Sequence, residues 1–255
     1  MTTQLFAPGG YRFIPAVFQY SGGVAAEAGY RIERVTFRKP VPLAAGFASI
    51  KSIIEGRGRP LTSFCACELR SPEPFTESGF RAFNELYVGT LREWCLFDGQ
   101  TNPVARSNVC PELHKPQAPS FHAFAFTVPA TDAEPSFCVA GSGECPEGKG
   151  NYRDHIVRRG DVSADGLAEK ARWVLSEMER RLAALGASWS STTGVQVYTV
   201  HDFHTLVARE IVPRGAAHAG LTWHYCRPPV VDIEYEMDCR GVAIEHTADT
   251  GRVLN

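Results

Sequence analysis

The feature that most constrains the fold of this chain is a repeated order of strand-like and helix-like patterns on both sides of residues 128–136, VPATDAEPS. Each half reads strand, helix, strand, helix, strand, although the halves share few identical residues. Such repetition is typical of an old duplication, and a sheet with helices on one face is an α+β unit. The sequence therefore predicts two tandem α+β halves, residues 1–130 and 131–255. The expected strands cover residues 29–37, 63–69, 120–128, 136–143 and 194–200, and the expected helices lie around residues 47–54, 76–94, 165–185 and 202–211.

The clearest element is the helix expected over residues 165–185. Its apolar residues follow the spacing of one buried helix face, and Gly186 ends the pattern. The strand of residues 194–200 carries apolar side chains on both of its faces. Because helices cover only one face of each sheet, the other face must pack against a second sheet, within this chain or in another copy.

The composition argues against several classes of protein. A net charge of -2 gives no electrostatic case for binding nucleic acid or an anionic membrane. No apolar run is long enough to span a bilayer, and the first residues lack the pattern of a signal peptide. The eight cysteines are then expected to be reduced thiols in a cytoplasmic protein. Core packing rather than zinc binding is expected for the four in strand-like apolar contexts, Cys65, Cys67, Cys138 and Cys239.

The segment of residues 230–241, VVDIEYEMDCRG, places an acid at every second position. A period of two predicts a β-strand with Asp232, Glu234, Glu236 and Asp238 on one face. Neighbouring carboxylates raise one another's pKa, so four of them are costly to bury as ions. Either this face is solvated or paired with arginines, or Glu234 or Glu236 is catalytic.

The stretch of residues 221–229, LTWHYCRPP, places His224 and Cys226 on one face of an extended chain. Together they could contact a substrate in a cleft. A Cys–His pair can also form a nucleophile, and ordinary core packing is the third interpretation.

Several motifs together resemble the Rid (YjgF-type) imine deaminase family. The first half carries a helix of the form F-x-x-x-N-x-x-Y, with Phe80, Asn84 and Tyr87, followed by VARSNV at residues 104–109. The second half carries SGECP at residues 142–146, similar to the family's S-G-Q-I-P, and DIEYE at 232–236, similar to its last strand. The resemblance covers nearly the whole chain as two tandem copies.

The resemblance implies a fold and a site. Each half would be a Rid-like (bacterial chorismate mutase-like) mixed β-sheet with two helices on one face, and the family assembles as a trimer with clefts between subunits. The family site uses an arginine for the substrate carboxylate and a glutamate on the last strand for the attacking water. Those roles suit a guanidinium fork and a carboxylate.

Neither half matches both family residues. Arg106 matches the arginine in the first half, where Phe121 and His122 stand in place of the glutamate. Glu234 matches the glutamate in the second half, where the arginine position falls near Ala219. The resemblance therefore implies one site that pairs Arg106 with Glu234 across the halves. The other expected substrate contacts are Tyr20, Ser142, Glu144, His224, Cys226 and Glu236.

These observations predict a hydrolase or deaminase of a small carboxylate-bearing imine, enamine or aromatic ring-cleavage product, such as an aminomuconate-like compound. No metal or organic cofactor is expected. The expected partner is a small anionic metabolite, with no nucleic acid or membrane, and the chain is expected to form a homo-oligomer, most simply a trimer. Two alternatives remain open: a chorismatase-like enzyme that cleaves an enolpyruvyl ether, and a metabolite-binding protein without catalysis.

Overall fold

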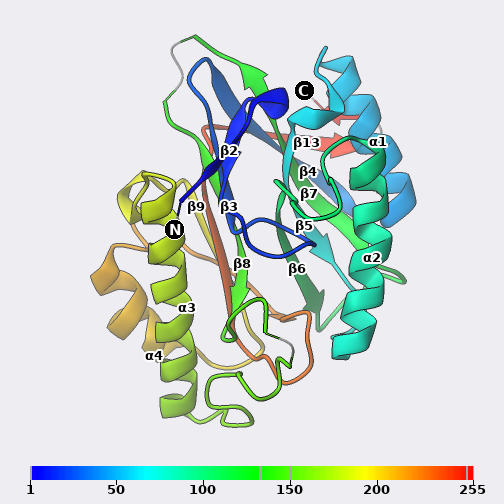
Figure 1. The fold of residues 1–255 in the computed structure, drawn as a ribbon. Coiled ribbons are helices and arrows are strands. Elements are labelled where there is room, and N and C mark those ends of the chain that lie inside the picture. The colour runs from blue at the N-terminus through cyan, green and yellow to red at the C-terminus, as the bar shows by residue number, and fades with distance from the viewer. Residues whose placement is uncertain (1, 132–133, 150, 251, 255) are drawn as a thin grey trace.

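The computed structural model describes residues 2–131, 134–149, 151–250 and 252–254. Two seven-stranded β-sheets pack face to face, and helices cover the outer face of each sheet. Figure 1 shows this order of layers, with α3 and α4 on one side of the strands and α1 and α2 on the other. The α+β class expected from the sequence is confirmed.

The first half forms a β-α-β-α-β-β unit with sheet order β6-β5-β7-β4. Strands β5 and β6 run parallel, and the β5–β7 and β4–β7 pairs are antiparallel. Its elements are β4 (Tyr30–Pro42), α1 (Leu43–Gly56), β5 (Phe64–Arg70), α2 (Glu77–Glu93), β6 (Ala105–Pro111) and β7 (Ser120–Pro129).

The second half repeats this connectivity with sheet order β10-β9-β12-β8. Strands β9 and β10 run parallel, and β12 is antiparallel to both β9 and β8. The tandem duplication predicted from the sequence is therefore present in the strand order itself. The elements are β8 (Phe137–Gly143), α3 (Ala164–Ala184), β9 (Gly194–Tyr198), α4 (His204–Leu206) with a π-helical turn (Val207–Ile211), β10 (Thr222–His224) and β12 (Glu236–Gly241).

The two halves exchange edge strands. Strands β1 (Gln4–Phe6), β2 (Tyr11–Phe13) and β3 (Gly23–Ala26) extend the second-half sheet beyond β8. In return, β13 (Ile244–Asp249) and β14 (Arg252–Leu254) extend the first-half sheet beyond β4, and β11 (Cys226–Arg227) pairs with β6. The division near residue 130 stays a prediction about the repeat, and residues 132–133 of its connecting segment lie outside the described residues. Short 3-10 turns occur at Ala7–Gly9, Leu61–Ser63, Trp189–Ser191 and Val212–Arg214.

Helix α3 forms where the apolar periodicity predicts it. The Ser163 side chain accepts a hydrogen bond from the backbone of Gly166 and caps the first turn. Gly186 follows the helix with a φ of 75°, a left-handed conformation that glycine adopts without strain. The apolar stripe packs on the outer face of the second-half sheet through Leu167, Ala171, Val174, Leu175, Met178 and Leu182.

The inner faces of the two sheets meet in a core of small side chains. Cys65 and Ala66 of β5 and Ala105 of β6 pack there with Cys138 and Ala140 of β8. The partner for the second face of each sheet is thus the other half of the same chain, and the trimer stays a prediction. Seven of the cysteines are buried and free, as expected for packed thiols. Across the described ranges, no helix is both long and apolar enough to cross a bilayer.

One expected strand is shorter than predicted. The alternating pattern over residues 230–241 is wrong as a strand before Glu236, where β12 begins. Asp232 is exposed and has a φ of 73°, which breaks an extended chain. His224 and Cys226 lie on strands of different sheets, because β10 pairs with β9 whereas β11 pairs with β6, and both side chains pack against Tyr198.

Candidate active site between the halves

Arg106 lies in a cage of aromatic rings contributed mainly by one face of α2. Its guanidinium carbon is 4.7 Å from the ring centre of Tyr87 and 5.8 Å from that of Phe80. Its Nη2 donates to Asn84 Oδ1 at 2.7 Å. These three residues are the F-x-x-x-N-x-x-Y motif, whose spacing puts them on one helix face. The residues of this motif therefore contact the guanidinium and hold it in place.

The charge of Arg106 has no ionic partner among the described residues. The side chain is only 3 % exposed, and its Nη1 is buried without a hydrogen-bond partner in the described part of the chain. A buried cation without a counter-ion is costly, and aromatic faces and one neutral amide compensate only part of that cost. This arrangement is suited to an anion that arrives from outside the protein.

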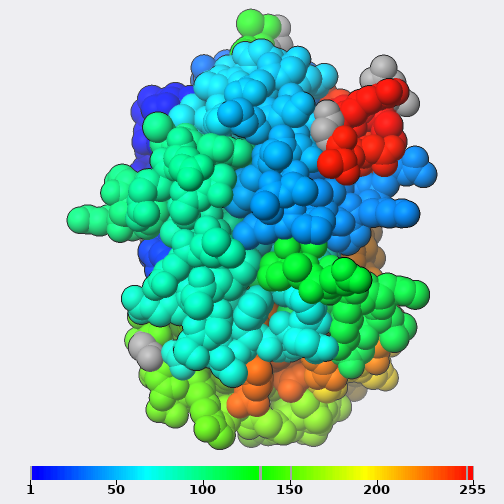
Figure 2. Space-filling model, turned by 90° about the vertical axis from the view of Figure 1, so that its right-hand side faces the viewer, coloured from blue at the N-terminus to red at the C-terminus, as the bar shows by residue number. Residues whose placement is uncertain are grey.

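Arg106 opens into a pocket that both halves line. Tyr20 and Phe80 form the wall on the first-half side, and Ser142, Ile233 and Glu236 lie on the second-half side. The enclosed space is small, about 50 Å³. Figure 2 shows the face covered by α1 and α2, with an orange segment beneath α2. The backbone N–H of Phe75 donates to the carbonyl oxygen of Pro229, and this hydrogen bond joins the two halves.

Two acids line this pocket: Glu147, which is paired with Arg181 at 2.8 Å, and Glu236, the first residue of β12. Glu236 is 4 % exposed, and burial raises its pKa well above the usual value for glutamate. Asp238 and Glu144 raise the pKa further, while Arg70 and Arg106 oppose them. The protonated acid is therefore favoured, which is the form that can donate a proton.

Two glycines of β8 make room for this acid. A Cβ built on Gly141 would meet Glu236 Oε1 at 2.2 Å, and one on Gly143 would meet Ile233 Cγ2 at 2.6 Å. Both distances are far below van der Waals contact, so side chains at these positions would displace the pocket wall. The glycines of the G-S-G sequence thus allow residues 233–236 to lie across β8.

Glu144 supports the site from behind and is not among the described residues that line the pocket. Its two carboxylate oxygens accept hydrogen bonds from the backbone N–H groups of Glu234 at 2.7 Å and Tyr235 at 3.0 Å. Lys170 of α3 donates to the same carboxylate at 2.9 Å, and neither side chain is exposed. This pair fixes the chain immediately before Glu236.

Glu234 lies elsewhere, so the expected pairing of Arg106 with Glu234 is not formed. Its carboxylate contacts His201 Nε2 at 2.8 Å and lies 3.8 Å from Arg227. Glu234 is also absent from the described residues around the Arg106 pocket. The acid that the structure brings to Arg106 is Glu236, two residues further along the same motif.

The other expected contacts are divided between the pocket and the space between the sheets. Tyr20 and Ser142 line the pocket, and the Tyr20 ring centre is 5.3 Å from the Arg106 guanidinium. His224 instead stacks on Tyr198 with ring centres 5.0 Å apart. Cys226 is buried beside the same tyrosine. Burial raises the pKa of the Cys226 thiol to about 11, which disfavours a thiolate nucleophile.

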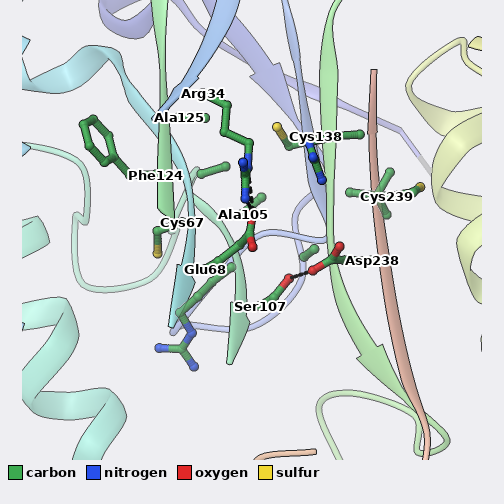
Figure 3. Close-up of a pocket in the computed structure, with 15 residues that line it drawn as sticks. Arg34, Cys67, Glu68, Ala105, Ser107, Phe124, Ala125, Cys138, Asp238 and Cys239 are labelled. Carbon is green, nitrogen blue, oxygen red and sulfur yellow. Dashed lines mark hydrogen bonds and ion pairs between the residues drawn. The ribbon is translucent and has the colours of Figure 1, made fainter. Parts of the chain in front are cut away.

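A second hollow lies between the sheets and carries a network of polar groups (Figure 3). Arg34 donates to Glu68 at 2.8 Å, and Ser107 donates to Asp238 at 2.5 Å. Asp238 also accepts hydrogen bonds from Gln196 and Tyr198. Because its carboxylate accepts hydrogen bonds from both β6 and β9, Asp238 fixes β12 to these two strands. It thereby holds the strand that begins with Glu236.

Sequence reasoning missed several residues of the pocket, among them Asn108, Cys145, Glu147 and Tyr152. A signal existed for Asn108, because alternate residues of a strand share a face and Arg106 stands two positions before it. Cys145 and Tyr152 lie in an irregular loop after β8, where no periodicity marks which side chains point inwards.

The chain is similar to several known proteins. The family described as 2-aminomuconate deaminase CnbZ matches residues 3–246. A 2-amino-5-chloromuconate deaminase from Comamonas testosteroni is 52% identical over 243 residues, which cover 94% of this chain and 97% of that protein. Among solved structures, a chorismatase gives a TM-score of 0.48 at 9% identity, covering 95% of this chain and 89% of that one. The YjgF gene product from E. coli gives a TM-score of 0.32 at 18% identity, and the match covers 42% of this chain and 80% of that one.

Proposed function

Because this chain belongs to the 2-aminomuconate deaminase family represented by CnbZ, we propose that it hydrolyses the C–N bond of an aminomuconate-like enamine or imine and releases ammonia. The pocket between the halves would be the site of this reaction. Arg106 would bind the carboxylate next to the reacting carbon, and Glu236 would carry the proton transfers.

The observation that carries this proposal is the uncompensated charge of Arg106. A substrate carboxylate can accept from the free Nη1 and supply the missing negative charge. The aromatic rings around the guanidinium exclude water, so this ion pair would be stronger than one at the surface. An enamine acid with its carboxylate on Arg106 would present its reacting carbon towards the opposite wall, which holds Glu236.

The proposed chemistry begins with the proton on Glu236. Transfer of that proton to the nitrogen of the imine tautomer gives an iminium ion and leaves a carboxylate. The carboxylate then accepts a proton from water as the water oxygen bonds to the iminium carbon. Return of the proton to nitrogen lets the C–N bond break. Ammonia leaves, and the proton on the carbinol oxygen returns to Glu236 as the carbonyl group forms.

Two matched variants of the same motif test this assignment. We expect Glu236→Gln to lose about 10²-fold or more in kcat, because an amide cannot deliver or accept the proton. Glu234→Gln should leave the rate nearly unchanged, because Glu234 faces His201 outside the pocket. The measurement is ammonia release from freshly generated 2-aminomuconate, with circular dichroism as the check on folding. Equal losses in both variants, or no ammonia from the unmodified protein, would refute the proposal.

A further inference from the structure

Asn108 is a second polar group of the pocket that nothing in the reaction above uses. It lies on β6, two residues after Arg106, and lines the same pocket. The side chain is 3 % exposed, and its Nδ2 is buried without a hydrogen-bond partner among the described residues. An unmade hydrogen bond at a buried amide costs free energy, so this donor is available to a ligand.

The orientation of this amide is fixed by its neighbour. The Ser71 hydroxyl donates to Asn108 Oδ1 at 2.9 Å, so the oxygen side of the amide is occupied. The N–H side is left without a partner among the described residues, on a side chain that lines the pocket. Because an amide N–H can only donate, its partner on a ligand must be an oxygen acceptor such as a carboxylate.

The spacing along β6 specifies where that oxygen lies relative to the group on Arg106. Residues two apart on a strand share a face and lie about 6–7 Å apart. The two carboxyl carbons of an extended six-carbon diacid are separated by about 6 Å, from ordinary bond lengths. Apolar side chains of Val230 and Ile233 line the pocket as well and suit a hydrocarbon chain between two polar ends.

We propose that Asn108 is the specificity-determining residue for the distal carboxylate of a six-carbon dicarboxylic substrate. Arg106 holds the carboxylate next to the reacting carbon, and the Asn108 amide donates to the carboxylate at the other end. This inference rests on the proposed function and assigns the residue that recognises the second carboxylate of its substrate. A monocarboxylic enamine would leave the amide unpaired and would bind more weakly.

The test compares two stable ligands that differ only at the distal end. Muconate carries a carboxylate where sorbate, the matching hexadienoate, carries a methyl group. Isothermal titration calorimetry on the full chain should show muconate bound about 10-fold or more tightly than sorbate, as expected for a hydrogen bond to a charged group. Asn108→Ala should remove that preference by weakening muconate while leaving sorbate within about twofold.

Asn108→Asp is the second variant, since it keeps the shape of the side chain. Its carboxylate should repel the distal carboxylate and weaken muconate further than alanine does, with sorbate less affected. Unchanged sorbate binding also shows that the pocket is folded in each variant. The inference is overturned if the unmodified protein binds the two ligands equally, or if Asn108→Ala weakens both to the same degree.

Failure of the inference and failure of the proposed function give different results. If the unmodified protein binds muconate selectively but releases no ammonia from 2-aminomuconate, the subsite stands and the reaction is wrong. If ammonia is released while Asn108→Ala keeps full selectivity for the diacid, the reaction stands and another residue recognises the distal carboxylate.

Discussion

The two halves of this chain share one strand order, but two of their buried cations, Arg106 and Lys170, are used in opposite ways. Arg106, on β6 of the first half, is 3 % exposed and has no acidic partner in the described ranges. Lys170, on α3 of the second half, is fully buried and donates to Glu144 at 2.9 Å and to the Val157 carbonyl at 2.9 Å. The first charge is left open to the pocket, and the second is satisfied within the fold.

The comparison extends to the strands that carry the site. Strand β10 takes the place of β6 in the second half and has no arginine, and β7 takes the place of β12 in the first half and has no acid. Each half has therefore kept one member of the pair, the cation in the first and the acid in the second. A duplicated fold with this division has one complementary site, at the boundary, and neither half is expected to catalyse the reaction alone.

Removal of the Arg106 charge tests the open side of the comparison and should have the largest effect. Arg106→Met fills similar volume without charge, so we expect kcat/KM to fall about 10³-fold, because the substrate carboxylate then enters a pocket without a cation. The melting temperature should stay constant or rise, since a costly buried charge is gone. Steady-state kinetics and calorimetry measure both quantities.

A clear drop in the melting temperature of Arg106→Met would contradict this view and assign the arginine to the core. Arg38→Met is the matched control, because Arg38 and Asp249 form an ion pair in which both side chains are exposed. Its kinetics should match those of the unmodified protein.

Removal of the Lys170 charge should show the reverse pattern. Lys170→Met leaves Glu144 buried without its cation, so we expect the free energy of unfolding to fall by about 3–5 kcal/mol. Adding Glu144→Gln removes the orphaned charge and should restore part of the loss, since an amide oxygen can still accept from the backbone at residue 234. Urea denaturation measures both variants, and a neutral result for Lys170→Met would show that the pair is unimportant.

Much of the fold was predictable because periodicity reports on which faces are buried. The apolar stripe of α3 and the alternation in β5 and β7 gave the elements, and their repetition gave the tandem arrangement. Arg106 was a candidate only because the motif on α2 and the VARSNV motif on β6 resemble a family pattern, and the structure brings these two motifs into contact. In each of these segments, residues that lie close together in the sequence determine which element forms and which of its faces is buried.

The acid of the site was not predictable in the same way. Glu234 and Glu236 occupy equivalent positions in an alternating pattern, so the sequence favours neither. The choice depends on Glu144, which holds the backbone of residues 234 and 235 in a non-strand conformation from about ninety positions away. A contact of that range leaves no periodic trace, which is why the strand was expected to begin too early.

The close approach of β8 to Glu236 and to Ser107 of the first half depends on Gly141, and this is the next effect in size. Gly141→Ala should reduce stability by about 2 kcal/mol and lower activity as well, because the new methyl group displaces Glu236 from the pocket wall. Gly89→Ala on α2 is the control, since nothing lies within 4 Å of a Cβ at that position. That variant should be slightly more stable through helix propensity. Thermal unfolding and kcat are measured for both variants. A Gly141→Ala variant that is as stable and active as the unmodified protein would disprove the packing argument.

The smallest expected effect concerns two histidines that face each other between the sheets, His122 from β7 and His224 from β10. Their ring centres are 6.3 Å apart. Burial, with Arg70 nearby, lowers the pKa of His224 to about 4 and that of His122 to about 3. Both rings therefore stay neutral in the folded protein. In the unfolded chain the same histidines take up protons once the pH falls below about 6.5, the usual pKa of histidine.

The unfolded state binds more protons between pH 6.5 and about 4, so the free energy of unfolding should fall as the pH falls through that window. His224→Gln keeps a hydrogen-bonding side chain and removes one of the two titrations. We expect the slope to become shallower by roughly 1 kcal/mol per pH unit, reduced somewhat because His224 is partly exposed. Urea denaturation at several pH values measures the slope. An unchanged slope would mean that the second-half histidine contributes nothing to acid sensitivity, and that the first half alone carries it through His122.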